Sequence, residues 1–218
     1  MAGGAGIYLD NTNSANGNSG LWLNHDGAGP AISVMSDGYG GALDINHQGT
    51  GFAVEIVSGR GDAIYTSGEI STDRLRIRDG ADIAEPFEIA DEFGPEPGMV
   101  VVISPEADQD LEVSTRPYDR MVAGVISGAG DIHPGLVLAQ DGSEVDGEHP
   151  VALSGRVYVR AEAFSAPIQP GDLLTTSDLP GHAMKATEWR RTQGAVLGKA
   201  LTELEAGEGL VLVLVSLQ

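Results

Sequence analysis

Residues 42–56, ALDINHQGTGFAVEI, contain the pattern that decides the fold of the first third of the chain. Two apolar–x–apolar triplets, at 43–45 (LDI) and 54–56 (VEI), each follow an alanine and are separated by the glycine pair Gly49/Gly51. Alternating apolar residues are typical of a short strand with one buried face, and paired glycines are typical of a turn. The stretch therefore predicts short strands joined by Gly-rich turns.

The same triplet recurs on both sides of this stretch. From Leu21 onward the triplets begin 11, 11, 11 and 10 residues apart, and a weaker triplet begins at Ile64. The triplets begin at Ile7, Leu21, Ile32, Leu43, Val54 and Ile64. The glycines exclude an 11-residue helical repeat, because each would cost about 1 kcal/mol inside a helix. We therefore expect a repetitive β-stalk over residues 1–73.

Each repeat offers only two apolar residues to a core, which is too little burial for one chain to offset the entropy of ordering the repeat. Three chains around a common axis can bury these residues together, and each chain's strand can hydrogen-bond to its neighbours. The sequence therefore favours a homotrimeric β-helical stalk. A single-chain β-solenoid is the alternative.

Two histidines occupy equivalent positions in the repeat. His25 and His47 lie 22 residues apart, each after an apolar–Asn pair and before a glycine turn. On a threefold axis each would form a ring of three imidazoles that could hold a metal ion or an anion. The alternative is a polar layer that sets the register of the chains or faces water. We expect no resident cofactor or metal elsewhere.

From about Arg74 the regularly spaced glycines end and longer β-type segments begin. This change predicts an all-β barrel or sandwich head over 74–218. Only 188–192 is predicted as a helical turn. The predicted strands are 99–103, 111–113, 121–127, 136–138, 151–161, 173–176, 183–186, 195–201 and 210–217.

The head also contains an internal similarity. Residues 97–101 (PGMVV) resemble 170–174 (PGDLL), and 122–126 (VAGVI) resemble 196–200 (VLGKA), at offsets of 73 and 74 residues. Residues 111–116 and 184–188 occupy corresponding places, and 151–159 is matched with 210–217. The head is therefore predicted to hold two related units, 80–147 and 148–218.

Composition narrows the possible functions. The chain has 218 residues, no cysteine, and a formal charge of −20 from 32 acidic and 12 basic side chains. This charge repels phosphate backbones and anionic membranes, so we expect no nucleic-acid partner and no membrane insertion. No apolar run is long enough to span a bilayer, and the N-terminus is not a signal peptide.

Residues 80–88 (GADIAEPFE), the apolar run ending at 103, and 122–128 (VAGVISG) resemble the C-terminal domain of Bacillus-phage neck appendage proteins. This domain is known as the peptidase G2 or intramolecular-chaperone autoprocessing domain, and the resemblance covers roughly 75–130. Residues 155–159, 170–177 and 181–186 are similar to a segment common in bacterial and phage tail-associated surface proteins. The resemblance implies a trimeric head on a β-helical stalk, which in some members is released by self-cleavage.

In that family cleavage falls near the junction of stalk and head, which corresponds here to 68–73. Ser71 or Thr72 could act as an N–O acyl-shift nucleophile, assisted by Asp73. Three arginines at 74, 76 and 78 alternate with apolar residues just after this junction, and neighbouring aspartates suggest inter-chain salt bridges there. His182, in a Pro-Gly-His turn, is the best histidine candidate for a site in the head.

The sequence thus predicts a structural fibre or appendage of a phage tail or a related bacterial injection particle, rather than a turnover enzyme. Its expected partners are two further copies of itself, other particle components and possible host glycans or receptors, at an extracellular or virion surface. An autoproteolytic chaperone domain is one alternative. A carbohydrate-binding or hydrolysing tip, with Trp22, Tyr39 and Trp189 as the candidate stacking residues, is another.

Overall fold

The computed structural model divides the chain into two units, Met1–Ser71 and Thr72–Gln218. The structure describes residues 21, 23–26, 28, 30–36, 42–48, 50, 52–58, 63–78, 80–105, 111–139 and 147–216.

In the unit Met1–Ser71 the described residues form no strand and no bridge. The apolar side chains of the triplets are exposed: Ile32 is 62% exposed, Leu43 72% and Ile64 63%. A single-chain solenoid would join its coils by ladders within one chain, and the described part of this unit makes none. The trimeric stalk stays a prediction, because strands that pair between chains have no partner within one chain.

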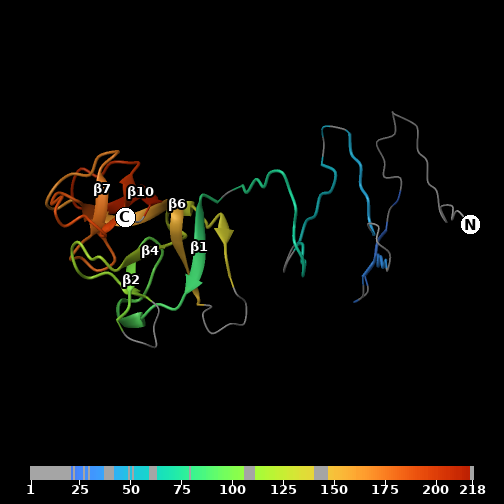
Figure 1. The fold of residues 1–218 in the computed structure, drawn as a ribbon, viewed down its shortest axis with the longest axis horizontal. Coiled ribbons are helices and arrows are strands. Elements are labelled where there is room, and N and C mark those ends of the chain that lie inside the picture. Colours follow the sequence, from blue (N-terminus) through green and yellow to red (C-terminus); the bar gives the residue numbers. More distant parts are fainter. Residues whose placement is uncertain are drawn as a thin grey trace, which may run out of the picture. The chain divides into compact units, whose positions relative to one another are not determined.

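The unit Thr72–Gln218 is all-β (Figure 1). Its described residues contain no α-helix and two single-turn 3₁₀ helices, η1 (Asp91–Phe93) and η2 (Ala129–Asp131). The strands are β1 (Asp82–Phe87), β2 (Val100–Ile103), β3 (Leu111–Val113), β4 (Val122–Ile126), β5 (Leu136–Val137), β6 (His149–Glu162), β7 (Leu173–Thr176), β8 (Ala183–Lys185), β9 (Val196–Ala200) and β10 (Glu208–Ser216).

Five of these strands close into a barrel in the order β10-β9-β7-β8-β6, because β6 also pairs with β10. The β6–β10 ladder is the longest of the unit and runs antiparallel from Glu208 opposite Glu162 to Ser216 opposite Ser154. Val157, Val159, Val211 and Val213 from these two strands are fully buried, together with Leu174 and Leu197 from the facing strands. Alternate residues of each strand therefore fill the barrel, as small closed barrels require.

The first half of β6 extends beyond the barrel into a second set of strands. There it pairs with β1 on one side and with β4 on the other, and the sheet continues through β2 to β3. A second core cluster lies in this region, formed by Met99, Val101, Leu111, Val113, Ile126, Val151 and Ile89. Among the described residues, the strand β5 pairs only with β1, so it forms one edge of the described sheet.

The pairs β2–β4 and β7–β9 have the same register. Val100, Val101 and Val102 lie opposite Val125, Gly124 and Val122, while Leu173, Leu174 and Thr175 lie opposite Lys199, Gly198 and Val196. Both ladders shift by one residue at the same step.

The backbone hydrogen bonds around these ladders also correspond. Gly98 donates its N–H to Ile126 O at 2.8 Å, and Gly171 donates its N–H to Ala200 O at 2.8 Å. The two glycines share a positive φ, of 89° and 94°, which the Pro-Gly turn before each strand requires. That the halves are related units stays a prediction, which this correspondence supports. Ile126 of β4 lies opposite Val151 of β6, and the corresponding Ala200 of β9 lies opposite Val213 of β10. Val151 therefore corresponds to Val213, whereas the predicted match of 151–159 with 210–217 placed it at Leu210.

The all-β head is confirmed, and its architecture is a barrel with additional strands rather than a sandwich. All nine predicted strands have counterparts, but β1, within the segment that carries the family resemblance, was not predicted as a strand. Residues 188–192 form a turn with hydrogen bonds from Arg191 N to Glu188 O and from Thr192 N to Trp189 O. The prediction that only 188–192 would form a helical turn was wrong, because the two 3₁₀ helices η1 and η2 lie in other segments.

Candidate functional site

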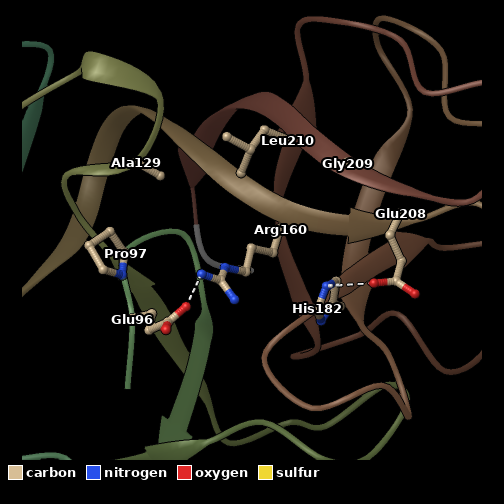
Figure 2. Close-up of a pocket in the computed structure, with 8 residues that line it drawn as sticks. All are labelled: Glu96, Pro97, Ala129, Arg160, His182, Glu208, Gly209 and Leu210. Atoms are coloured by element: carbon tan, nitrogen blue, oxygen red, sulfur yellow. Dashed lines mark hydrogen bonds and ion pairs between the residues drawn. The ribbon is translucent and has the colours of Figure 1, made fainter. Parts of the chain in front are cut away.

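A groove with a volume of 660 Å³ lies over the junction of the two halves of the head (Figure 2). Its walls come from the turn before β2, from η2, from β6, from the turn before β8 and from the start of β10. The lining residues are Glu96, Pro97, Ala129, Arg160, His182, Glu208, Gly209 and Leu210. The groove thus combines four ionisable side chains with a small apolar surface.

Arg160 projects from β6 into this groove and forms an ion pair with Glu96 (Figure 2). The backbone N–H of Arg160 donates to Gly98 O at 2.7 Å, which ties the C-terminal part of β6 to the turn before β2. The side chain of Arg160 is 31% exposed and that of Glu96 is 59% exposed, so water screens the pair and its contribution to stability is small. The pair nevertheless fixes the position of a guanidinium group at the groove wall.

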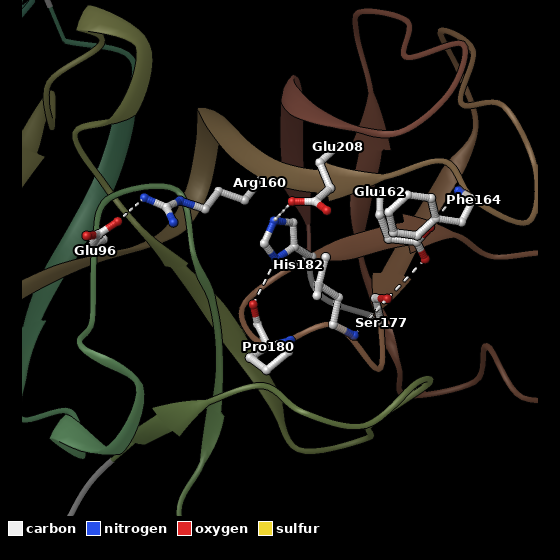
Figure 3. A network of polar contacts seen from close by, with 9 residues as sticks. Glu96, Arg160, Glu162, Phe164, Ser177, Pro180, His182 and Glu208 are labelled. Atoms are coloured by element: carbon white, nitrogen blue, oxygen red, sulfur yellow. Dashed lines mark hydrogen bonds and ion pairs between the residues drawn. The ribbon is translucent and has the colours of Figure 1, made fainter.

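His182 has a defined tautomer. Its Nδ1 lies 2.8 Å from Pro180 O, and because a carbonyl only accepts, Nδ1 carries the hydrogen. The other ring nitrogen, Nε2, therefore points toward Glu208, whose Oε2 is 3.9 Å away (Figure 3). At neutral charge Nε2 is a hydrogen-bond acceptor, and Glu208 Oε2 is a second acceptor beside it.

A buried polar cluster lies beyond His182 (Figure 3). Ser177 donates its hydroxyl hydrogen bond to Glu162 Oε1 at 3.0 Å, and the Phe164 N–H donates to Glu162 Oε2 at 2.7 Å. Glu162 is 4% exposed and Ser177 is fully buried. Both carboxylate oxygens therefore have donors, as a buried carboxylate requires, and this cluster fixes the loop between β7 and β8 that carries His182.

The groove can offer a guanidinium donor, two carboxylate acceptors and an imidazole acceptor to a polar ligand. The described residues contain no cluster of three or more His, Cys, Asp or Glu side chains suited to a metal ion. No Ser, Thr or Cys is among the lining residues, and the reactive side chains of the groove are the carboxylates of Glu96 and Glu208 and the imidazole of His182.

The residues predicted for autoprocessing lie outside this groove. Ser71, Thr72 and Asp73 are all exposed. The Thr72 hydroxyl is within hydrogen-bonding distance of the backbone of Arg74, at 3.2 Å from its O and 3.4 Å from its N.

The two histidines of the repeat, His25 and His47, are exposed as well. Whether they form rings on a threefold axis stays a prediction. Trp22 and Tyr39 lie outside the described residues, and Trp189 is 77% exposed in the turn after β8.

Sequence reasoning identified His182 but missed Glu96, Arg160 and Glu208. These three residues are far apart in the chain and belong to no local motif, so only the pairing of β6 with β10 and of Arg160 with Gly98 brings them together. The Pro-Gly turn at 97–98 was the one signal that could have pointed to Glu96.

No protein-family model matches the sequence, and no curated protein matches it. Among solved structures, the fold is similar to that of bacteriophage phi29 gene product 12 in its pre-mature form, with a TM-score of 0.49 and 16% sequence identity. The similarity covers 69% of this chain and 24% of the phage protein, so the chain corresponds to about a quarter of that neighbour's length. Among the described residues, no helix is long and apolar enough to cross a membrane.

Proposed function

We propose that the protein is a homotrimeric structural fibre or appendage of a phage tail or related injection particle, in which the repeats form the stalk and the head assists trimerisation. The observation that carries this proposal is the exposure of the triplet side chains in a single chain. Leu21, Leu23, Ile32, Val34, Leu43, Ile45, Val54, Ile56 and Ile64 are between 49% and 72% exposed.

Such a periodic apolar surface is unfavourable in water for an isolated chain. Burying a valine or leucine side chain contributes about 1.5–3 kcal/mol, and a large exposed apolar surface marks an interaction site. Because the same two-residue element recurs at a nearly constant spacing, the partner must present the same repeat in the same register. A second and a third copy of this chain satisfy that condition, and the resemblance of residues 75–130 to trimeric appendage domains agrees with it.

The test is the mass of the full chain by light scattering coupled to size exclusion. A mass of three chains that persists on dilution is expected. A monomer at all concentrations would exclude the trimeric stalk and leave the apolar triplets to a different partner.

Autoproteolytic release is an alternative that the exposed junction residues support. If it occurs, intact-mass measurement will show cleavage within 68–73, and Ser71→Ala or Thr72→Ala will abolish it. Asp73→Asn should slow the same cleavage. A chain that keeps its full mass through assembly would remove this function.

Carbohydrate binding at the head is a further alternative, favoured by the carboxylates of Glu96 and Glu208 in one groove with Arg160. Vicinal hydroxyl groups of a sugar can donate to a carboxylate and accept from a guanidinium. A glycan array compared between the wild type and Arg160→Met would test this. Binding that is unchanged in the variant would place any glycan elsewhere, at Trp189 for example.

A further inference from the structure

Two elements of the head each lack one hydrogen-bonding neighbour. The first is the edge strand β5, whose one strand partner in the part of the head that the structure describes is β1. The second is the segment 74–78, which has no strand or bridge partner in its own chain among the described residues. An edge strand can accept an added strand, and the segment 74–78, which has no strand partner of its own, can supply one.

The edge at β5 is apolar and uncovered. Leu136, Val137 and Leu138 are 37%, 46% and 50% exposed, and Ile83, which lies opposite Leu136 on β1, is 44% exposed. Leu138 donates its N–H to Ala84 O on β1 at 2.9 Å. Because successive residues of a strand direct their backbone groups to opposite sides, the N–H and C=O of Val137 point away from β1. An exposed apolar edge of this kind is an aggregation hazard unless another strand covers it.

The segment 74–78 has the alternation of a strand with one apolar side. Leu75 and Ile77 are 71% and 43% exposed, and Arg74, Arg76 and Arg78 alternate with them. Leu75 also begins 11 residues after Ile64, so the segment continues the spacing of the stalk repeat into the unit that contains the head. The arginines are exposed and have no ion-pair partner among the described residues.

We propose that the segment 74–78 of one copy adds as a strand to the β5 edge of the next copy, so that three heads close into a head-to-tail ring. This inference rests on the proposed homotrimer and names its interface in the head. The two-residue spacing of Leu75 and Ile77 matches that of Leu136 and Leu138, so the four side chains pair on one face of the new ladder. Arg76 then lies opposite Val137, whichever direction the added strand runs.

The net charge of the chain favours a second copy of the same chain as the partner that supplies the strand at the β5 edge. Each chain carries a net charge of −20, so identical copies repel one another unless basic groups lie between them. The segment 74–78 concentrates three of the twelve basic residues in five positions, immediately before β1. Each added segment therefore places three guanidinium groups against an acidic neighbour. A head-to-tail contact can close into a ring, in which every segment and every edge is used once.

The experiment is cysteine cross-linking of the full chain, which contains no cysteine of its own. The double variant Arg76→Cys with Val137→Cys, treated with an oxidant or a short bismaleimide, should lose its monomer band on a denaturing gel and form a covalent trimer. The matched control is Arg76→Cys with Leu214→Cys, because Leu214 is 43% exposed but lies in β10 between two paired strands. That control pair and both single variants should stay monomeric on the gel.

Each outcome has a distinct meaning. If the native wild type is a trimer and the double variant cross-links no more than the control, strand addition at β5 is wrong and the trimeric fibre stands. If Arg76→Cys alone forms covalent dimers, the segments meet one another rather than β5, which also overturns the inference. A wild type that is monomeric by light scattering would remove the proposed function itself, and the interface with it.

Discussion

The phenolic oxygen of Tyr118 accepts a hydrogen bond from the backbone N–H of Thr187 at 2.9 Å. It accepts a second one from the N–H of Glu188, also at 2.9 Å, and the guanidinium of Arg191 lies over its ring at 4.4 Å from the centroid. Tyr118 precedes β4 and Thr187 follows β8, so a single side chain links the two halves of the head. Tyr118 also has a φ of 60°, which is uncommon for a residue with a side chain.

Replacing Tyr118 by phenylalanine should destabilise the head by about 1–3 kcal/mol, because two backbone N–H groups lose their acceptor. The measurement is a urea titration followed by circular dichroism. Tyr158→Phe is the control, since no described residue hydrogen-bonds to the Tyr158 hydroxyl, and its midpoint should stay close to the wild type. Equal midpoints for both variants would show that the Tyr118 contacts do not hold the halves together.

Alanine at Gly124 or Gly198 should destabilise the head by about 3 kcal/mol each, because a Cβ cannot fit. A Cβ at Gly124 would lie 2.6 Å from Ala152 O, and one at Gly198 would collide with Leu214 O. Thermal unfolding compares these variants with Gly171→Ala, where a Cβ meets nothing within 4 Å and only the positive φ costs about 1–2 kcal/mol. Similar losses are expected for Gly124 and Gly198, because they hold equivalent places in the two ladders. A large loss at only one of them would argue against equivalent roles.

The ion pair between Lys185 and Asp172, at 2.7 Å, should make stability depend on pH in the acid range. Burial raises the pKa of the Asp172 carboxyl, but the hydrogen bonds from Lys185 and from the Gln169 N–H, together with the lysine charge, outweigh it and lower the pKa below 3.8. A carboxyl with a lowered pKa stabilises the fold above its unfolded pKa, and this stabilisation is lost as the pH falls through the folded value. Lys185→Met should therefore lower the melting temperature at pH 7. The difference in melting temperature between the variant and the wild type should disappear in acid, once the Asp172 carboxyl is protonated in the folded state.

Lys199→Met is the control for this pH series, because Lys199 is exposed and has no ion pair among the described residues. Its melting temperature should follow the wild type at every pH. A difference between Lys185→Met and the wild type that persists unchanged into acid would assign the effect to packing of the lysine stem instead of its charge.

In the stalk, Val34→Ala should weaken the trimer, and Ser33→Ala should not. If Val34 packs at the trimer axis, its truncation removes about 0.8 kcal/mol of burial for each lost CH₂-sized group, and three chains multiply the loss. Ser33 occupies the middle of the same triplet and faces the other way in a strand. Light scattering during dilution compares the two variants. Equal dissociation of both would contradict the inward orientation of the triplets.

Much of the head could be predicted from sequence because its strands carry local signals. The Pro-Gly turns at 97–98 and 170–171 precede β2 and β7. The segments 122–126 and 196–200 are apolar and bounded by turn residues, which is typical of strands, and they form β4 and β9. Strand β1 was missed because proline and two acidic residues interrupt its alternation, and it is pairing with β6 that makes it a strand. The groove could not be predicted, because Glu96, Arg160 and Glu208 meet only through long-range pairing.

The long ladder between β6 and β10 has a consequence for the order of events during synthesis. The stalk repeats leave the ribosome before the head, with their apolar triplets uncovered, while the strand that closes the barrel is the last of the described elements to emerge. Contacts between distant segments form slowly, because the intervening chain must first be closed into a loop. During that interval the stalks of the proposed trimer would be able to pair out of register. In the proposed trimer, a barrel that forms only once β10 is available would therefore join the heads after the stalk repeats of all three copies have been synthesised.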